Sequence, residues 1–416
     1  MRSNAHADLP LHHGRVPPWL ANRMATLGRA IVEAILVEYG KGEFMKRISD
    51  PLWFQSFGAV MGMDWHSSGI TTSVVGALKR AINPISNELG IYVCGGRGRH
   101  SRKTPTELMQ IADRTGLDGQ ELVRCSRLTA KVDNTAIQDG FQIYLHSFIL
   151  TKEGDWAVVQ QGMNEQNGYA RRYHWHAAEF ASFINDPHTS ILGQNQGLIL
   201  NLTHQKAGDT QEGILDIVGQ HPTKMVQEIR KIRMPARHDV KARDVDLRRL
   251  GSIIALANER EMLDFEDLLL LEGLGPRTLQ SLTLVSEVIH GTRSRFEDPA
   301  RYSFAHGGKD GKPFPVPLKV YDETIATLRK AVDKAKIGHS DRQRAIKSLH
   351  TTAKRIEENF VPNDNFDQLV EKEWQDSRKY GGRTVMDDQR EGKSYFTYTP
   401  TRKRKAKPNT GQLSLF

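Results

Sequence analysis

Two carboxylates that precede a predicted β-hairpin offer the first candidate chemistry in this chain. Asp133 and Asp139 stand just before a hairpin expected between residues 141 and 163. Carboxylate oxygens beside a strand can hold Mg²⁺ or Mn²⁺ and leave positions open for phosphate and water. We therefore predict both as metal ligands, with Asp139 also catalytic, in a metal-dependent cleavage of DNA. The usual acid-x-lysine triplet of such sites is missing from the second strand, where Gln161 and Met163 stand instead.

Two further segments combine reactive side chains. Asp64 and His66 share the loop Asp64-Trp65-His66-Ser67-Ser68-Gly69, where each is a candidate ligand or general base, although a buried turn would use the same residues. The segment Tyr169–His176 mixes aromatic residues, arginines and histidines. We predict Arg171 and Arg172 as phosphate contacts and His174 as catalytic. Aromatic core packing explains this second pattern at least as well.

A leucine-rich helix, a glycine turn and a second helix are expected between residues 264 and 290. Asp264 can cap the first helix, and Pro276 can begin the second, where its missing N–H costs nothing. Amides at the start of the second helix form a natural phosphate site. The pattern resembles the helix-hairpin-helix motif, which binds the DNA backbone without reading sequence. Its expected contact residues are Gly273, Leu274, Gly275, Arg277 and Thr278. The alternative is an ordinary helical hairpin.

A glycine-rich basic loop is the second expected phosphate contact. Residues 95–103 combine three glycines with Arg97, Arg99, Arg102 and Lys103. The helix start expected at Thr104 places these cations near the positive end of a helix. A solvated basic loop without a ligand explains the composition equally well.

The chain ends in an apolar pentapeptide after a basic, polar segment. A solvated tail gains nothing from two leucines and a phenylalanine unless a partner buries them. The residues of the pentapeptide are Gln412, Leu413, Ser414, Leu415 and Phe416. They resemble the sliding-clamp-binding motif of bacterial replication and repair proteins, and this resemblance implies a bacterial host. Gln412 would supply the amide, and the three apolar side chains the anchors.

Composition limits the classes of partner. The formal net charge of +9 favours a polyanion, of which nucleic acid is the commonest. Two cysteines, Cys94 and Cys125, exclude a disulfide framework and a four-cysteine zinc site. No apolar run approaches the roughly 20 residues that span a bilayer. The N-terminus lacks the residue order of a signal peptide. We expect a cytoplasmic, nucleoid-associated protein with no membrane partner.

The periodicity predicts an α+β fold that is mainly α. Residues 18–45 show helical spacing, residues 91–94 a short strand, and residues 141–150 and 156–161 the two strands of a hairpin. Helical spacing returns after residue 210. We predict a mixed domain with a small sheet over residues 1–235, a helical domain over 236–361, and a polar, disordered basic tail over 362–416.

Several segments together carry a family pattern, including Asp64–Gly69, Ser101–Pro105, Lys131–Asn134, Trp156–Asn164 and Arg301–Gly311. They resemble the prokaryotic domain-of-unknown-function family 763. The resemblance covers roughly residues 5 to 350 and excludes the tail. It implies a prokaryotic protein and carries no established active site.

Three functions compete at this point. The first is a metal-dependent DNA nuclease that the sliding clamp recruits during replication or repair. The second is a DNA glycosylase, whose catalytic aspartate after the helical hairpin would be Asp298. The third is a clamp-associated DNA-binding adaptor without catalytic activity.

Overall fold

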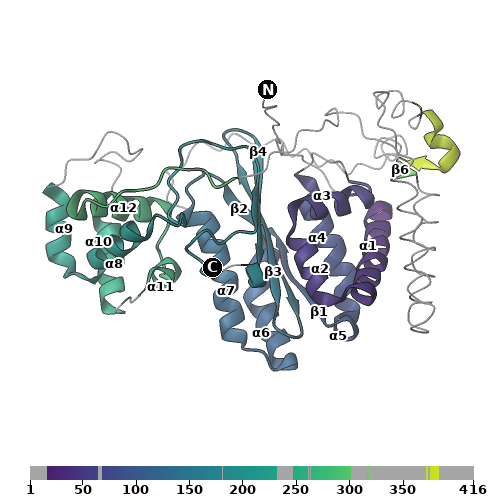
Figure 1. Cartoon of the computed structure of the whole chain (residues 1–416), viewed down its shortest axis with the longest axis horizontal. Helices are drawn as coiled ribbons and strands as arrows, with labels where there is room; N and C mark the ends of the chain where they lie inside the picture. The colour runs from purple at the N-terminus through teal and green to yellow at the C-terminus, as the bar shows by residue number, and fades with distance from the viewer. Residues whose placement is uncertain are drawn as a thin grey trace.

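A five-stranded antiparallel sheet in the order β1-β2-β3-β4-β5 lies at the centre of the protein. Its strands are β1 (Ile91–Arg97), β2 (Gln142–Thr151), β3 (Trp156–Asn164), β4 (Tyr169–His176) and β5 (Ser190–Leu192). The computed structural model describes residues 16–63, 68–179, 181–231, 247–260, 262, 264–300, 316–317, 372 and 375–383. Helices cover both faces of the sheet (Figure 1). The fold is α+β and mainly α, as the sequence predicts.

One face of the sheet packs against the N-terminal helices. These are α1 (Pro18–Glu38), α2 (Gly40–Ser49), α3 (Pro51–Val60), α4 (Gly69–Ile82) and the short α5 (Ser86–Leu89). Leu145 and Val159 of the sheet share a buried cluster with Met24 and Val74 of these helices. The single helix predicted over residues 18–45 is split at Tyr39, and Gly40, the first residue of α2, takes a positive φ of 81°.

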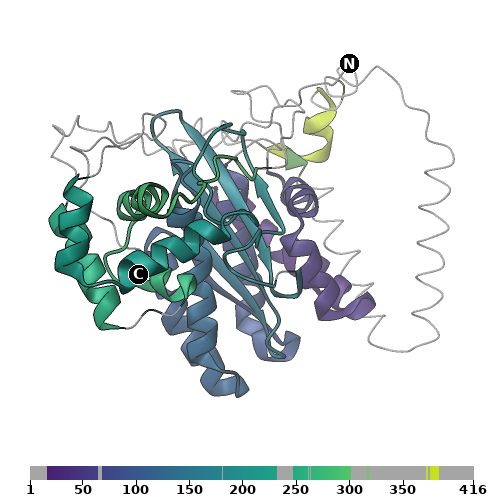
Figure 2. The same ribbon diagram turned by 60° about the vertical axis from the view of Figure 1, so that its left-hand side comes forward.

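The other face packs against the later helices. These are α6 (Thr104–Thr115), α7 (Gly119–Lys131), α8 (Gly208–Gly219), α9 (Pro222–Lys231), α10 (Leu247–Glu259), α11 (Phe265–Leu270) and α12 (Pro276–His290). Phe148 and Val158 of the sheet belong to one buried cluster with Leu268 and Leu282. Figure 2 shows the teal and green helices α8 to α12 on the same side of the sheet as the blue helices α6 and α7. The helices on both sides of the predicted boundary at residue 235 therefore share one hydrophobic core.

The predicted β-hairpin is confirmed, and the register defines one end of the sheet. β2 and β3 pair from Leu150↔Trp156 to Gln142↔Met163, and the turn at residues 152–155 joins them. Arg97 at the end of β1 pairs with Leu145, and Tyr169 at the start of β4 pairs with Asn164. β1 and β3 therefore end where β2 and β4 begin. We call this the Arg97 end of the sheet.

Two smaller features complete the described chain. Val316–Pro317 (β6) pairs with Gly382–Arg383 (β7) beside the 3₁₀ helix Ser377–Tyr380. Within the described ranges, every helix is too short or too polar to cross a membrane.

Candidate nucleic-acid interface

The turn between α11 and α12 has the geometry that its sequence predicts. The Asp264 carboxylate accepts a hydrogen bond from the Asp267 N–H at 2.7 Å and caps α11. Gly273 takes a φ of 82° in the turn, which is a conformation that favours glycine. The Leu274 side chain is fully buried, and Pro276 occupies the first turn of α12. The turn is therefore tight and anchored from within.

Three side chains from other segments bind the carbonyl groups of this turn. Lys131 Nζ donates to Leu274 O at 2.9 Å, and Gln138 Nε2 donates to Pro276 O at 2.9 Å. Arg249 Nη2 donates to Gly273 O at 3.1 Å. Burial lowers the pKa of the Lys131 ammonium group. These contacts fix the turn against α7, α10 and the segment that precedes β2.

The start of α12 presents positive charge at the surface, because Arg277 is exposed. The first helical hydrogen bond of α12 runs from the Leu279 N–H to Gly275 O at 3.0 Å, so the N–H groups of Arg277 and Thr278 precede it without an acceptor inside the helix. Thr278 as a whole residue is buried, with 7% exposure, so its hydroxyl does not form the expected surface contact, and Arg277 is the exposed residue that follows Pro276.

The basic loop also begins from a fixed anchor. The Gly95 N–H donates to Glu107 Oε2 at 2.8 Å, and Lys79 Nζ donates to Gly95 O at 2.9 Å. Lys79 and Glu107 are themselves joined by an ion pair of 2.7 Å. These bonds tie the end of β1 to α4 and α6. The loop therefore leaves the sheet in a defined direction.

Beyond this anchor the loop exposes its cations at the start of α6. Gly98–Lys103 forms a 3₁₀ helix that runs directly into α6. Its exposed side chains, together with the end of β1, are Arg97, Arg99, His100, Arg102 and Lys103. The Arg97 guanidinium also lies over the Tyr144 ring, 5.7 Å from its centroid. The predicted basic surface is thus present at the Arg97 end of the sheet.

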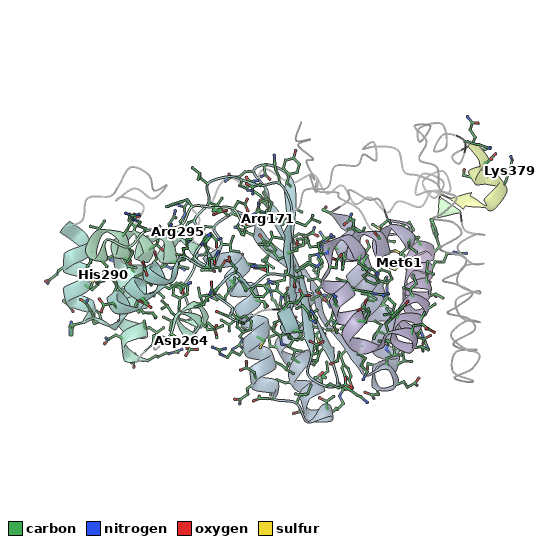
Figure 3. The ribbon with its side chains drawn as sticks, in the orientation of Figure 1. Met61, Arg171, Asp264, His290, Arg295 and Lys379 are labelled. Carbon is green, nitrogen blue, oxygen red and sulfur yellow. The ribbon has the colours of Figure 1, made fainter. Side chains whose placement is uncertain are left out.

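Asp139 lies in a buried ion-pair cluster. Its Oδ2 accepts hydrogen bonds from Arg171 Nη1 at 2.8 Å and from the Tyr173 hydroxyl at 2.6 Å. Arg171 also forms a two-pronged pair with Asp298, at 3.0 and 2.6 Å. Burial would lower the pKa of Arg171, but the two carboxylates raise it above its usual value. Figure 3 shows Arg171 on the sheet, well apart from Asp264 at the start of α11.

Asp133 lies in a second buried cluster on the same face of the sheet. Its Oδ2 accepts from Gln160 Nε2 at 2.5 Å and from Trp175 Nε1 at 3.0 Å, and its Oδ1 bonds with His188 Nε2. Burial raises the pKa of Asp133 despite these hydrogen bonds. Gln160 also bonds His146 at 2.8 Å.

Arg172 and His174 lie on the opposite face, packed against the N-terminal helices. Arg172 Nε donates to His174 Nε2 at 2.9 Å, and its Nη2 donates to Gln55 Oε1 at 2.8 Å. Burial lowers the pKa of Arg172 to about 9, and no described carboxylate pairs with it. Burial and the Arg172 charge hold the pKa of His174 well below its usual value. Arg172 is therefore a buried structural cation with neutral partners.

These three clusters correct part of the expected interface. Arg171 and Arg172 have 0% exposure, so neither guanidinium reaches a phosphate at the surface. His174 is equally buried and accepts its bond from Arg172. Strand β4, which carries these arginines and histidines, is buried in the interior. This agrees with the alternative interpretation of Tyr169–His176 as core packing. Asp64, His66 and the pentapeptide 412–416 lie outside the described residues.

The two predicted metal ligands do not lie together in an open site. Asp139 is neutralised by Arg171, and Asp133 is surrounded by Gln160, Trp175 and His188. Among the residues that the structure describes, no group of three or more His, Cys, Asp or Glu side chains is placed to hold a metal ion. Neither carboxylate offers free coordination positions in this arrangement.

Sequence reasoning missed the partners that complete these clusters. Ser126 and His146 bond at 2.8 Å, and the sequence suggests Asp298 only as a glycosylase residue. The partners come from positions far along the chain, for example 127 residues between Arg171 and Asp298. An alternation of polar residues along β4 is the one local signal that could have indicated a buried strand.

The buried His146 predicts a loss of stability in acid. Burial lowers the pKa of His146 from 6.5 to about 4. In that window the unfolded chain binds a proton and the folded chain does not, so the free energy of unfolding falls as the pH drops from 6.5 towards 4. Urea unfolding midpoints across this range measure the effect. The His146→Gln variant should lose less stability over the same range, and equal losses in both proteins would contradict the assignment.

The comparison with known proteins identifies the family. No curated protein and no solved structure matches the chain. A family model described as "Protein of unknown function (DUF763)" matches residues 5–316, which include the sheet, the basic loop and the α11–α12 turn. The chain therefore belongs to the DUF763 family.

Proposed function

We propose that this protein binds the phosphate backbone of DNA through the turn between α11 and α12. The observation that carries the proposal is the anchored turn itself. Leu274 is buried beneath it, and three side chains hold its carbonyl groups. Arg277 is exposed at the start of α12, where its own N–H group has no acceptor inside the helix. Such a site binds phosphate and reads no base sequence.

Recruitment by the bacterial sliding clamp is the second part of the proposal. It is supported by the sequence Gln412–Phe416 at the end of a basic segment. Deleting these five residues is expected to abolish binding to purified bacterial clamp and to leave DNA affinity unchanged. Clamp binding that survives the deletion would contradict this part alone.

The geometry supports the adaptor function better than the two enzyme functions. Asp133 and Asp139 are buried and engaged, and Asp298 is held by Arg171 and by the N–H groups of Gln196 and Ala300. The nuclease alternative therefore depends on Asp64 and His66. Labelled single-stranded, duplex, flap and forked DNA with Mg²⁺, Mn²⁺ or EDTA tests it. Metal-dependent cuts would favour the nuclease, and alkali-revealed abasic sites the glycosylase.

Removing the Arg277 charge is expected to weaken DNA binding across unrelated sequences. In Arg277→Ala the affinity should fall several-fold, and the dependence of log K on log salt should become shallower by about 1. Glu272→Gln, which removes an exposed negative charge from the same turn, should strengthen binding. Fluorescence anisotropy with labelled duplexes measures both effects.

The matched control is Arg114→Ala. Arg114 is an exposed arginine in the last turn of α6, at the helix end opposite the basic loop. Its removal changes the net charge by the same amount and should leave affinity unchanged. Equal losses in Arg277→Ala and Arg114→Ala would show that net charge, and not the turn, determines binding.

A further inference from the structure

A row of cations runs along α7 towards the α11–α12 turn. Arg124, Arg127 and Lys131 are spaced three and four residues apart and therefore share one face of the helix. Arg124 pairs with Glu266 of α11 at 3.0 Å. Lys131 donates to Leu274 O in the turn. This face of α7 thus adjoins α11 and the turn.

Arg127 differs from its two neighbours on this face. It is exposed, and it forms no ion pair within the described part of the chain. Its neighbours have structural partners, but its own charge projects from the surface beside the turn. An exposed arginine in such a position is available to a phosphate group.

The basic loop lies at the same end of the α6–α7 pair. Only residues 116–118 separate α6 from α7, so the two helices are antiparallel neighbours, and α6 begins where α7 ends. Axes of packed helices lie about 8–10 Å apart. The basic loop before α6 and the turn beyond α7 are therefore separated by roughly two such spacings, about 20 Å.

A DNA duplex fits this arrangement. It carries one negative charge per roughly 1.7 Å of its axis, and it stays straight over lengths far above 20 Å, about 150 base pairs. One duplex laid across the ends of α6 and α7 can therefore meet the loop, Arg127 and the turn together. A flexible single strand would have to be ordered to do so, at a cost in conformational entropy.

We propose that the α11–α12 turn, Arg127 and the basic loop form one continuous surface for the backbone of a single DNA duplex. The inference rests on the proposed function and adds to it the substrate class and the contact residue Arg127. The surface covers about 20 Å between the loop and the turn, and roughly 30 Å with the contacts at both ends, which corresponds to about six to nine base pairs at roughly 3.4 Å per base pair. Shorter duplexes reach only part of it.

The test measures the binding of the full chain to duplexes of about 6, 12 and 24 base pairs, a series chosen to span that length. The variants are Arg127→Ala and the loop variant Arg99→Ala/Arg102→Ala, with Arg114→Ala as the control. Wild-type protein should bind the two longer duplexes more tightly than the shortest one. The gain in affinity should exceed the factor expected from the larger number of overlapping binding positions on a longer duplex. Arg127→Ala should lose several-fold affinity and about one unit of salt slope on the long duplexes.

The outcomes separate this inference from the proposed function. If Arg277→Ala weakens binding while Arg127→Ala and the loop variant match Arg114→Ala, the continuous surface is wrong and the turn remains a DNA-binding site. If the protein prefers single strands, the duplex assignment is overturned. If no variant changes DNA affinity, both proposals fail. Because all the substituted side chains are exposed, thermal unfolding should be unchanged and confirms that each variant folds.

Discussion

Asp298→Ala is expected to lower the free energy of unfolding by about 3–5 kcal/mol, because it leaves Arg171 buried without its two-pronged partner. Both Arg171 hydrogen bonds to Asp298 lie in the interior, and the Asp298 carboxylate also accepts from the N–H groups of Gln196 and Ala300. The remaining Asp139 cannot replace this geometry, since it already binds Tyr173. Urea unfolding measures the loss.

Glu297→Ala is the matched control for this substitution. Glu297 is the preceding residue, its side chain is 72% exposed, and its one ion pair within the described residues is with His204 at 3.4 Å. Its removal should cost less than about 1 kcal/mol. An Asp298→Ala protein as stable as Glu297→Ala would contradict the structural role of Asp298 and return it to consideration as a catalytic residue.

Gly95→Ala should destabilise the protein by about 3–5 kcal/mol, from steric overlap and backbone strain together. A Cβ atom at Gly95 would lie 2.2 Å from His146 O and 2.6 Å from Thr104 Oγ1. The residue also has a φ of 79°, which L-residues rarely adopt. Relief requires β1 to move away from β2, where Gly95 pairs with Ser147.

Gly98→Ala separates the cost of steric overlap from the cost of backbone strain. Gly98 has a φ of 57° in the same loop, but no atom from elsewhere in the described chain lies within 4 Å of the position that a Cβ would take. Only the conformational cost of about 1–2 kcal/mol should therefore appear. Equal losses in the two variants would show that the close approach of β1 to β2 is not what requires glycine at residue 95.

Features fixed by neighbouring residues were predictable from the sequence. The α11–α12 turn follows from Asp264, two glycines and Pro276 within 13 residues. In the structure Asp264 caps α11, Gly273 takes the positive φ and Pro276 begins α12, whereas Gly275 has an extended φ of −127°. The hairpin of β2 and β3 follows in the same way from alternation and from a turn at Gly154, whose φ is 96°. Local hydrogen bonding and backbone preference determine both elements.

The role of β4 could not be predicted in the same way. Its arginines and histidines suggest a surface, because charged residues are seldom fully buried. In the structure both faces of β4 are covered, and partners from distant segments satisfy the charges, as Gln55 does for Arg172 across 117 residues. The sequence contains those partners but does not indicate which of them meet.

The predicted metal ligands show the same limit. Asp133 and Asp139 stand where a nuclease would place carboxylates, before a hairpin. Their neighbours determine whether they can bind a metal. Arg171 and Tyr173 donate hydrogen bonds to Asp139, and Gln160 and Trp175 donate hydrogen bonds to Asp133. Burial raises the pKa of both carboxyl groups.

The salt dependence of DNA affinity is the most direct test of the central claim. Wild-type protein should be titrated with two duplexes of equal length and unrelated sequence between about 50 and 200 mM salt. Backbone binding predicts equal affinities and a linear fall of log K with log salt, with a slope that counts the phosphates contacted. No binding at the lowest salt concentration, or an affinity that does not change with salt concentration, would contradict binding to the DNA backbone.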